Sequence, residues 1–283
     1  MYDSTKMNGI GYMGAIKMLD DEDLRYLIAL ADTAGEAIMS FYDKSDELQH
    51  AVKTDTSPLT AADLASNEIL VLGLQTRWPH IPILSEESVN TFTNREQPEL
   101  YWAVDPLDGT KEFIKGNGEF TVNIALVVNG EPQIGVVGAP ARGLMYVGTY
   151  GDVYEFDAHA KKRDADGWKN IRVSGVSIDL LGDQPLRVAM SRSHPSAELE
   201  KWLEQFRTVD GRDIGSSLKF CLVAEGTVDV YPRLGPTCIW DTAAGHALVI
   251  AAGGNVSQWN DSPLKYADPS ITLNPFFIAW GHA

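Results

Sequence analysis

Apolar residues recur every three or four positions between Leu24 and Phe41, a spacing that predicts an amphipathic helix. The acids at 21–23 lie in its first turn, where the helix dipole favours negative charge. Further along, residues 60–63 have the form of a capping box, Thr-Ala-Ala-Asp, which predicts that a second helix begins there. This helix is expected to run to about Trp78.

The middle of the chain is rich in β-prone runs that Gly, Pro and Asn separate. The predicted strands are residues 101–104, which stop at Asp105, followed by 120–128, 133–138, 144–149 and 153–156. Short strands with turn residues between them favour an antiparallel meander.

Beyond residue 185 strands and helices alternate. Strands are predicted at 186–191 and 228–231, and helices at 196–206, 216–225 and 241–252. The change of pattern predicts three parts with a boundary within 161–184: a flexible leader at 1–20, an α+β half at 21–160 and an α/β half at 185–283.

The charge balance restricts the partners. The chain has 23 Lys and Arg against 39 Asp and Glu, a formal net charge of −16. Nucleic-acid polymers and anionic membranes are bound mainly through clustered Lys and Arg, so neither is expected as a partner. An anionic substrate would need a local source of positive charge.

Several features favour a soluble protein of the cytoplasm. No stretch approaches the roughly 20 apolar residues of a membrane helix, and residues 1–20 lack the apolar run of a targeting signal. Cys221 and Cys238 are too few for a disulfide scaffold and lack a Cys-x-x-Cys spacing. Reduced thiols are therefore expected.

The segment Asp-Pro-Leu-Asp-Gly-Thr at 105–110 is the most informative for chemistry. Its proline and glycine favour a tight turn that brings the carboxylates of Asp105 and Asp108 together. Like charges at that separation are unfavourable without a cation. Because Mg²⁺ accepts carboxylate and carbonyl oxygens, the loop can supply both Asp side chains and the carbonyl of Leu107. The alternative is an ordinary Asp-Pro and Asp-Gly turn.

Further acids lie where a β-run ends or a helix begins. Glu86 and Glu87 follow an apolar run and are either ligands or a solvated strand end. Asp241 serves equally well as the N-cap of the helix at 241–252, and the capping box explains Asp63. Such edges are where sites assemble in α/β proteins. Two Mg²⁺ ions would balance the charge of four carboxylates: Glu86, Asp105, Asp108 and Asp241.

The motifs taken together resemble those of one known family: Leu-Thr-Ala-Ala-Asp at 59–63, Ser-Glu-Glu at 85–87, Asp-Pro-Leu-Asp-Gly-Thr at 105–110 and Trp-Asp-Thr-Ala-Ala-Gly at 240–245. From about Leu24 to the C-terminus the chain is similar to the lithium-sensitive inositol monophosphatase superfamily of Mg²⁺-dependent phosphomonoesterases. Within it, the chain is most similar to bacterial 3'(2'),5'-bisphosphate nucleotidases in these segments: 102–126, 191–194, 215–226 and 231–245.

The resemblance implies an α/β (α+β) fold, the layered αβαβα sandwich of the inositol monophosphatase and sugar phosphatase type. It implies two or three Mg²⁺ ions held by five groups: Glu86, Asp105, the carbonyl of Leu107, Asp108 and Asp241. Glu86 and Thr110 would orient the attacking water, and Asp63 would polarise Thr110. Backbone donors of Gly109 and Thr110 would reach the phosphate.

A larger set of residues is implied for binding the substrate: Glu86, Leu107, Asp108, Gly109, Thr110, His194, Ser216, Lys219, Arg233 and Asp241. Lys219 and Arg233 are cations of the kind that a second phosphate needs, although either is also consistent with a surface charge. Cys238 stands where close relatives carry Asn, while its neighbours Trp240 and Asp241 match the motif.

The implied activity is hydrolysis of a small phosphorylated nucleotide, adenosine 3',5'-bisphosphate (PAP), to AMP and phosphate, a reaction of sulfur metabolism. Inositol monophosphatase activity on the same catalytic core is the first alternative. The second is a non-catalytic metal or nucleotide sensor, against which the water-orienting residues argue. A cytoplasmic location is expected, with a peripheral position on the inner membrane as a variant, and the oligomeric state is left open.

Overall fold

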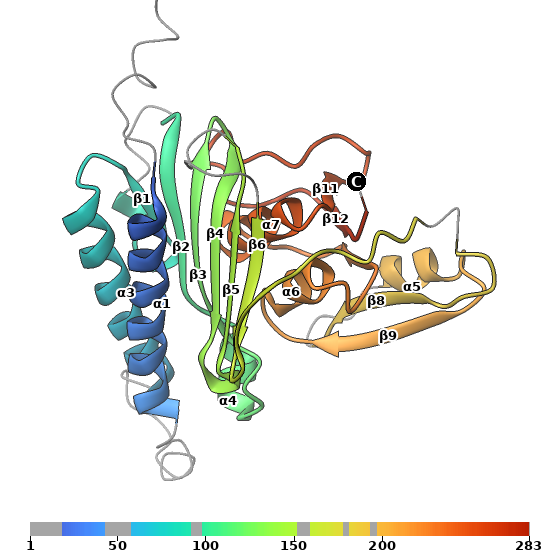
Figure 1. Cartoon of the computed structure of the whole chain (residues 1–283), viewed down its shortest axis with the longest axis horizontal. Helices are drawn as coiled ribbons and strands as arrows, with labels where there is room; N and C mark the ends of the chain where they lie inside the picture. The colour runs from blue at the N-terminus through green and yellow to red at the C-terminus, as the bar shows by residue number, and fades with distance from the viewer. Residues whose placement is uncertain are drawn as a thin grey trace, which may run out of the picture.

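The computed structural model describes residues 19–42, 58–91, 98–151, 159–177, 181–192 and 197–282. Two sheets alternate with three layers of helices, and the expected αβαβα sandwich is confirmed (Figure 1). The two long N-terminal helices form the first layer, two helices lie between the sheets, and a short helix covers the outer face of the second sheet.

The first helical layer and the first sheet come from the N-terminal part of the chain. The helices are α1 (Asp21–Tyr42) and α3 (Pro58–Arg77). The strands, in both chain order and sheet order, are β1 (Ile83–Ser85), β2 (Leu100–Asp108), β3 (Thr121–Val128), β4 (Glu131–Ala139), β5 (Leu144–Thr149), β6 (His159–Asp164) and β7 (Gly167–Asn170). β1 is parallel to β2, and each later pair is antiparallel. The predicted meander is confirmed.

Side chains alternate between the two faces of this sheet. Trp102 and Val104 of β2 pack into the core beneath α1 and α3, whereas Tyr101 and Ala103 pack into the core around the middle helices. Successive residues of a strand point to opposite faces. Asp105 therefore faces the middle helices, and this orientation places it in the site described below.

The second sheet and the remaining helices come from the C-terminal part. The middle layer holds α6 (Leu218–Ala224) and α7 (Ile239–Ala251), and α5 (Ala197–Leu203) packs on the far face of the second sheet. That sheet has the order β11-β12-β10-β8-β9. Its strands are β8 (Leu186–Ser191), β9 (Val209–Ile214), β10 (Val230–Arg233), β11 (Asn255–Gln258) and β12 (Phe277–Trp280).

Helix α7 lies directly on the first sheet because two glycines leave room for it. A Cβ atom at Gly135 of β4 would lie 2.1 Å from the Ala244 carbonyl oxygen, and one at Gly148 of β5 would lie 2.5 Å from the Leu248 Cα atom. Such distances are far below van der Waals contact, so only glycine permits this approach. The position of α7 against the sheet is thereby fixed.

Several predicted boundaries are wrong. The second helix begins at Pro58, with Thr60 already inside it, so residues 60–63 are not a cap. β2 does not stop at Asp105 but continues to Asp108. Helix α7 begins at Ile239 with Cys238 as its N-cap, so Asp241 is not the N-cap. The strand expected at 153–156 lies outside the described residues, and five strands were not predicted: β6, β7, β9, β11 and β12.

The division into a leader and two halves stays a prediction. Residues 1–18 lie outside the described part, while Leu19 is buried in the core with α1. The hairpin of β6 and β7 occupies part of the expected boundary segment and belongs to the first sheet. No helix among the described residues is both long and apolar enough to cross a bilayer, and nothing supports the peripheral membrane position.

Candidate active site

Parallel pairing of β1 with β2 brings two acids together at one end of the first sheet. Ser85 is the register partner of Val104, so the residues that follow, Glu86 and Asp105, are neighbours. Leu84, two residues before Glu86, packs on the same side of the sheet as the middle helices. Both acidic side chains therefore extend toward α7.

A β-bulge shapes the segment 105–108. Asp105 pairs with Asn123 of β3, but Asp108 pairs with Thr121, so β2 holds one extra residue here. The Leu107 amide donates a hydrogen bond to Asp105 Oδ1 at 3.0 Å. The Ser66 hydroxyl of α3 donates to the Pro106 carbonyl at 2.8 Å. The expected turn is thus a bulge, anchored from both sides.

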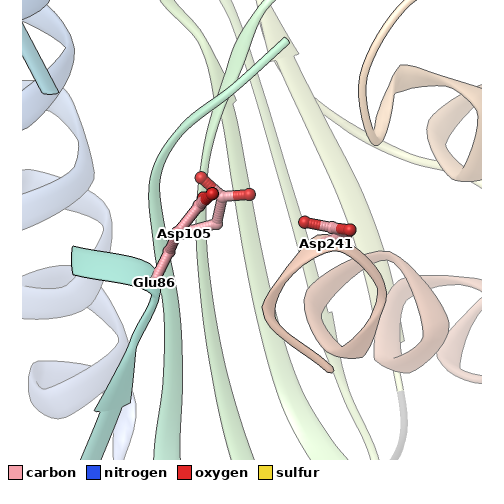
Figure 2. A group of neighbouring side chains, drawn as sticks. All are labelled: Glu86, Asp105 and Asp241. Carbon is pink, nitrogen blue, oxygen red and sulfur yellow. The ribbon is translucent and has the colours of Figure 1, made fainter. Parts of the chain in front are cut away.

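Asp241 reaches the same place from the first turn of α7. Its Oδ2 atom accepts a hydrogen bond of 2.7 Å from the Cys238 amide, which closes a capping box and orients the carboxylate. One carboxyl oxygen from each of Glu86, Asp105 and Asp241 lies within 4.8 Å of the other two (Figure 2). We call these three residues the acidic cluster.

The acidic cluster fits a divalent metal ion on its own chemistry. Burial, and then the charges of Asp108, Glu86 and Asp241, raise the pKa of Asp105 well above its ordinary value. Burial followed by neighbouring carboxylates raises the pKa of Glu86 and of Asp241 to about 7. The Oδ2 atom of Asp105 is buried without a hydrogen-bond partner. A cation would relieve the repulsion and engage that oxygen.

Asp108 lies beside the acidic cluster and is oriented by a different segment. Its Oδ2 atom accepts hydrogen bonds from the Ser216 hydroxyl at 2.7 Å and from the Ser217 amide at 2.6 Å. Burial raises its pKa, and Lys219 together with these two donors opposes the rise. One oxygen of Asp108 is thus held by the loop between β9 and α6.

Asp63 and Thr110 are near the acidic cluster but are not joined to each other. Asp63 lies on α3, where burial and then the charges of Glu87 and Glu86 raise its pKa to about 8. Its Oδ1 atom is buried without a hydrogen-bond partner. Thr110 is the first, exposed residue of α4 (Thr110–Lys115). Among the hydrogen bonds of the described residues, none connects the two side chains.

A pocket of about 270 Å³ opens beside the acidic cluster. It gathers seven of the residues expected to bind substrate: Asp108, Gly109, Thr110, Ser216, Lys219, Arg233 and Asp241. The Leu107 side chain instead lies in the core beneath α1 and α3. His194 lies outside the described residues.

Two buried cations line the wall of the pocket formed by the C-terminal part. Lys219 donates from Nζ to the Ser216 carbonyl at 2.6 Å, and burial lowers its pKa to about 8. The Arg233 guanidinium donates to the carbonyls of Pro236 at 2.8 Å and Gly235 at 3.3 Å. Neither cation pairs with a carboxylate in the described part of the chain, so both remain suited to an anionic ligand.

Sequence reasoning missed a polar network behind Asp108. The Thr121 hydroxyl lies 2.5 Å from the Ser216 hydroxyl and 2.8 Å from that of Ser217, which in turn donates to Asn123 Oδ1 at 2.7 Å. Thr121 and Asn123 are polar positions of one face in the otherwise apolar run 120–128. That interruption was a usable signal, because buried polar groups require partners.

Comparison with known proteins agrees with this geometry. The model of the inositol monophosphatase family matches residues 20–281. The chain belongs to this family. A relative from Salmonella typhimurium, 3'(2'),5'-bisphosphate nucleotidase CysQ, is 45% identical over 254 residues, which cover 90% of this chain and 98% of that protein.

Solved structures of the family agree as well. The crystal structure of CysQ from Bacteroides thetaiotaomicron matches with a TM-score of 0.78 at 37% identity, covering 92% of this chain and 97% of that one. An inositol monophosphatase from Anabaena matches with a TM-score of 0.68 at 27% identity, covering 92% and 89%. The expected family and fold are confirmed.

The raised pKa values predict how metal-free protein responds to pH. The folded state holds protons on the acidic cluster that the unfolded chain has already released, so stability falls as pH rises from about 4 to about 7. Adding Mg²⁺ should raise the melting temperature more at pH 8 than at pH 5.5. Differential scanning calorimetry in chelator and in Mg²⁺ measures both effects.

The matched control is Asp105→Asn, which removes the most buried charge of the acidic cluster and should flatten the pH dependence in chelator. If wild type and Asp105→Asn melt alike at every pH, and Mg²⁺ shifts neither, the acidic cluster does not bind metal.

Proposed function

We propose that the protein is a Mg²⁺-dependent 3'(2'),5'-bisphosphate nucleotidase that hydrolyses PAP to AMP and phosphate. The observation that carries this proposal is the pocket itself. Asp241 of the acidic cluster and the neighbouring Asp108 line the pocket, and the buried cations Lys219 and Arg233 line the same pocket. A substrate with one phosphate to be cleaved and another to be held matches that arrangement. The relatives named CysQ support the same activity.

The metal would be held by residues already near one another. We assign this role to Glu86, Asp105, the Leu107 carbonyl, Asp108 and Asp241, with two or three Mg²⁺ ions. When bound, the ions supply charge neutralisation for the phosphate and activation of a water molecule. Their number and identity belong to this proposal, and inhibition by lithium is expected from the family resemblance alone.

The chain positions the reacting groups. Glu86 and the Thr110 hydroxyl would orient the attacking water, and Asp63 would polarise Thr110. The amides of Gly109 and Thr110 would donate to the phosphate. Gly109 has φ 98°, and a Cβ atom there would lie 2.9 Å from the Glu119 carbonyl, so the backbone needs glycine to take this path.

The reaction balances as an in-line displacement. The water oxygen forms a bond to phosphorus as the bond between phosphorus and the 3'-oxygen breaks. The water gives up a proton, and a proton reaches the departing 3'-oxygen, so AMP and inorganic phosphate result.

Recognition of the rest of the nucleotide falls to the C-terminal part. Lys219 and Arg233 would contact the 5'-phosphate, since a charge-assisted hydrogen bond from guanidinium to phosphate is strong and directional. Ser216 and His194 complete the proposed contacts. The second candidate is inositol monophosphatase activity, the activity for which the Anabaena protein is named. The two candidate activities differ in whether the substrate needs Lys219 and Arg233. The cytoplasmic location stays a prediction.

Asp105 should be the least replaceable residue of the acidic cluster, because it lies between Glu86 and Asp241 and is the most buried. Asp105→Asn keeps the shape and removes the charge. Release of phosphate from PAP at saturating Mg²⁺ should fall roughly 100-fold or more, the scale on which loss of one electrostatic stabiliser acts. Near-normal turnover of a correctly folded variant would contradict the assigned role.

The two cations should determine substrate preference. Lys219→Ala and Arg233→Ala should lower kcat/KM for PAP far more than for 3'-AMP, which has no 5'-phosphate to bind. Lys265→Ala, an exposed residue paired with Glu131, serves as the control. Equal losses on PAP and 3'-AMP would mean that the cations support only the catalytic core. No loss on either substrate would favour the inositol monophosphatase alternative.

A further inference from the structure

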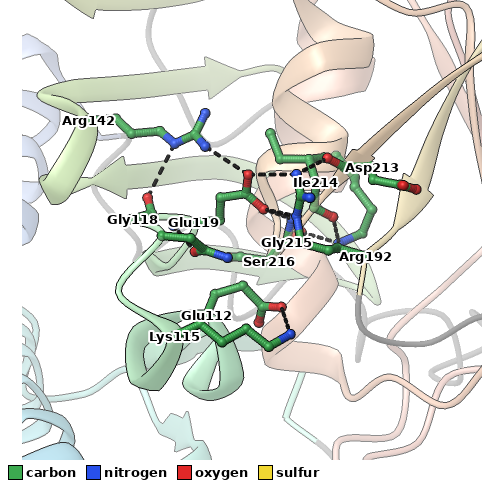
Figure 3. A network of polar contacts seen from close by, with 12 residues as sticks. Glu112, Lys115, Gly118, Glu119, Arg142, Arg192, Asp213, Ile214, Gly215 and Ser216 are labelled. Atoms are coloured by element: carbon green, nitrogen blue, oxygen red, sulfur yellow. Dashed lines mark hydrogen bonds and ion pairs between the residues drawn. The ribbon is translucent and has the colours of Figure 1, made fainter. Parts of the chain in front are cut away.

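Glu119 is a buried charged residue to which the mechanism above gives no role. It lies two residues before the start of β3 and is 6% exposed. Its two oxygens accept hydrogen bonds from Arg192 Nε at 2.8 Å, Arg192 Nη2 at 3.0 Å, Arg142 Nη2 at 3.0 Å and the Gly215 amide at 2.8 Å (Figure 3). We call these four residues the Glu119 clasp.

The Glu119 clasp joins the two sheets. Arg142 belongs to the short helix η2 (Pro140–Arg142) between β4 and β5 of the first sheet. Arg192 directly follows β8, and Gly215 directly follows β9, both strands of the second sheet. Arg192 also donates to the Asp213 carbonyl, and Arg142 donates to the Gly118 carbonyl at 3.2 Å. Each arginine thus braces Glu119 against a further stretch of backbone.

The charge of Glu119 is stabilised in place. Burial raises its pKa, but the hydrogen bonds from Arg192 and the Gly215 amide outweigh burial and leave the pKa below its usual value. The carboxylate therefore stays ionised over the working range of a phosphatase, and both of its oxygens remain acceptors.

One donor of the clasp leads directly into the proposed active site. Gly215 is followed by Ser216, whose φ of 58° is unusual for a residue other than glycine. The Ser216 hydroxyl and the Ser217 amide are the two donors to Asp108 Oδ2, and the Ser216 carbonyl accepts the bond from Lys219. The turn 215–217 thus connects Glu119 to one acid and one cation of the pocket.

The turn has little freedom to move. A Cβ atom at Gly215 would lie 2.5 Å from Glu112 Cγ and 2.9 Å from the Glu119 carbonyl oxygen. The backbone of Gly215 is therefore enclosed between α4 and the segment that leads into β3. A small displacement of Glu119 would be passed to Ser216 and from there to Asp108, because tightly packed interiors transmit strain.

We propose that Glu119, held by Arg192, is a positioning residue for hydrolysis: it fixes the turn 215–217 at the distance from which Ser216 and Ser217 orient Asp108. This inference rests on the proposed function, since it assigns Glu119 a role in the same reaction. It goes beyond that function by placing the control of Asp108 in a contact between the two sheets. None of the groups in the Glu119 clasp touches the reacting atoms.

Glu119→Gln tests the proposal, because it keeps the size of the side chain and removes the charge that Arg192 and Arg142 pair with. Arg192→Gln is the second variant; its side chain is partly exposed, so it is the milder change. For both variants we expect kcat on PAP to fall about tenfold or more, because small misplacements of catalytic groups lower the rate by such factors. The Mn²⁺ affinity without substrate, measured by electron paramagnetic resonance, should weaken about threefold or more. This loss is expected because Asp108, a proposed metal ligand, is reoriented.

The matched control is Asp23→Asn, which removes the charge of another buried carboxylate that pairs with an arginine, Arg77, between α1 and α3. It should lower the melting temperature to a similar degree but leave kcat and the Mn²⁺ affinity within about twofold of wild type, since Asp23 pairs with Arg77 and has no partner in common with the Glu119 clasp.

The outcomes separate this proposal from the proposed function. If wild type does not cleave PAP, the nucleotidase assignment fails, and the Mn²⁺ titration still tests the link from Glu119 to Asp108. If wild type cleaves PAP and both clasp variants behave like Asp23→Asn in kcat and in Mn²⁺ affinity, the Glu119 clasp only stabilises the fold and the proposal is overturned. Loss of turnover together with weaker Mn²⁺ binding, at a melting temperature equal to that of the control, supports it.

Discussion

Repulsion among neighbouring carboxylates is the constraint on which the rest of the molecule depends. Glu86, Asp105 and Asp241 come from three separate parts of the chain. Burial raises the pKa of each, and the charges of Asp108, Glu86 and Asp241 raise that of Asp105 further. Such a group of like charges is unfavourable at a site partly removed from water. The fold must therefore hold these acids together despite their mutual repulsion. A bound divalent cation would relieve the repulsion, and that relief would contribute to the affinity for the metal.

The scaffold meets that requirement with rigid elements. Parallel pairing of β1 with β2 places Glu86 beside Asp105, and the bulge at 106–107 keeps Asp108 at the same edge. Close contact of α7 with two strands fixes the position of Asp241, since Gly135 and Gly148 leave no gap between helix and sheet. Sites built on helices and strands hold their geometry better than sites built on loops. The pocket beside them is lined by Lys219 of α6 and by Arg233 at the end of β10.

Local patterns were enough to predict much of this molecule. The periodicity of α1 and the β-runs between residues 120 and 149 follow from contacts close in sequence, and the structure has them nearly as expected. β9 gave no signal because its residues are mostly exposed. The starts of α3 and α7 and the bulge in β2 were mispredicted because Pro58, Cys238 and the register with β3 decide them. The donors to Asp108 lie more than 100 residues away, so no local pattern reveals them.

The proposed function requires that the acidic cluster hold the catalytic metal next to the pocket. A crystal of the protein grown with Mn²⁺ and AMP, measured for anomalous scattering, tests it most directly. Anomalous peaks should lie at about 2.2 Å from carboxylate oxygens of Asp105, with Glu86 and Asp241 as further ligands and the AMP phosphate directed at Lys219 and Arg233. Absence of any peak at these residues, in a preparation whose hydrolysis of PAP depends on added metal, would contradict it.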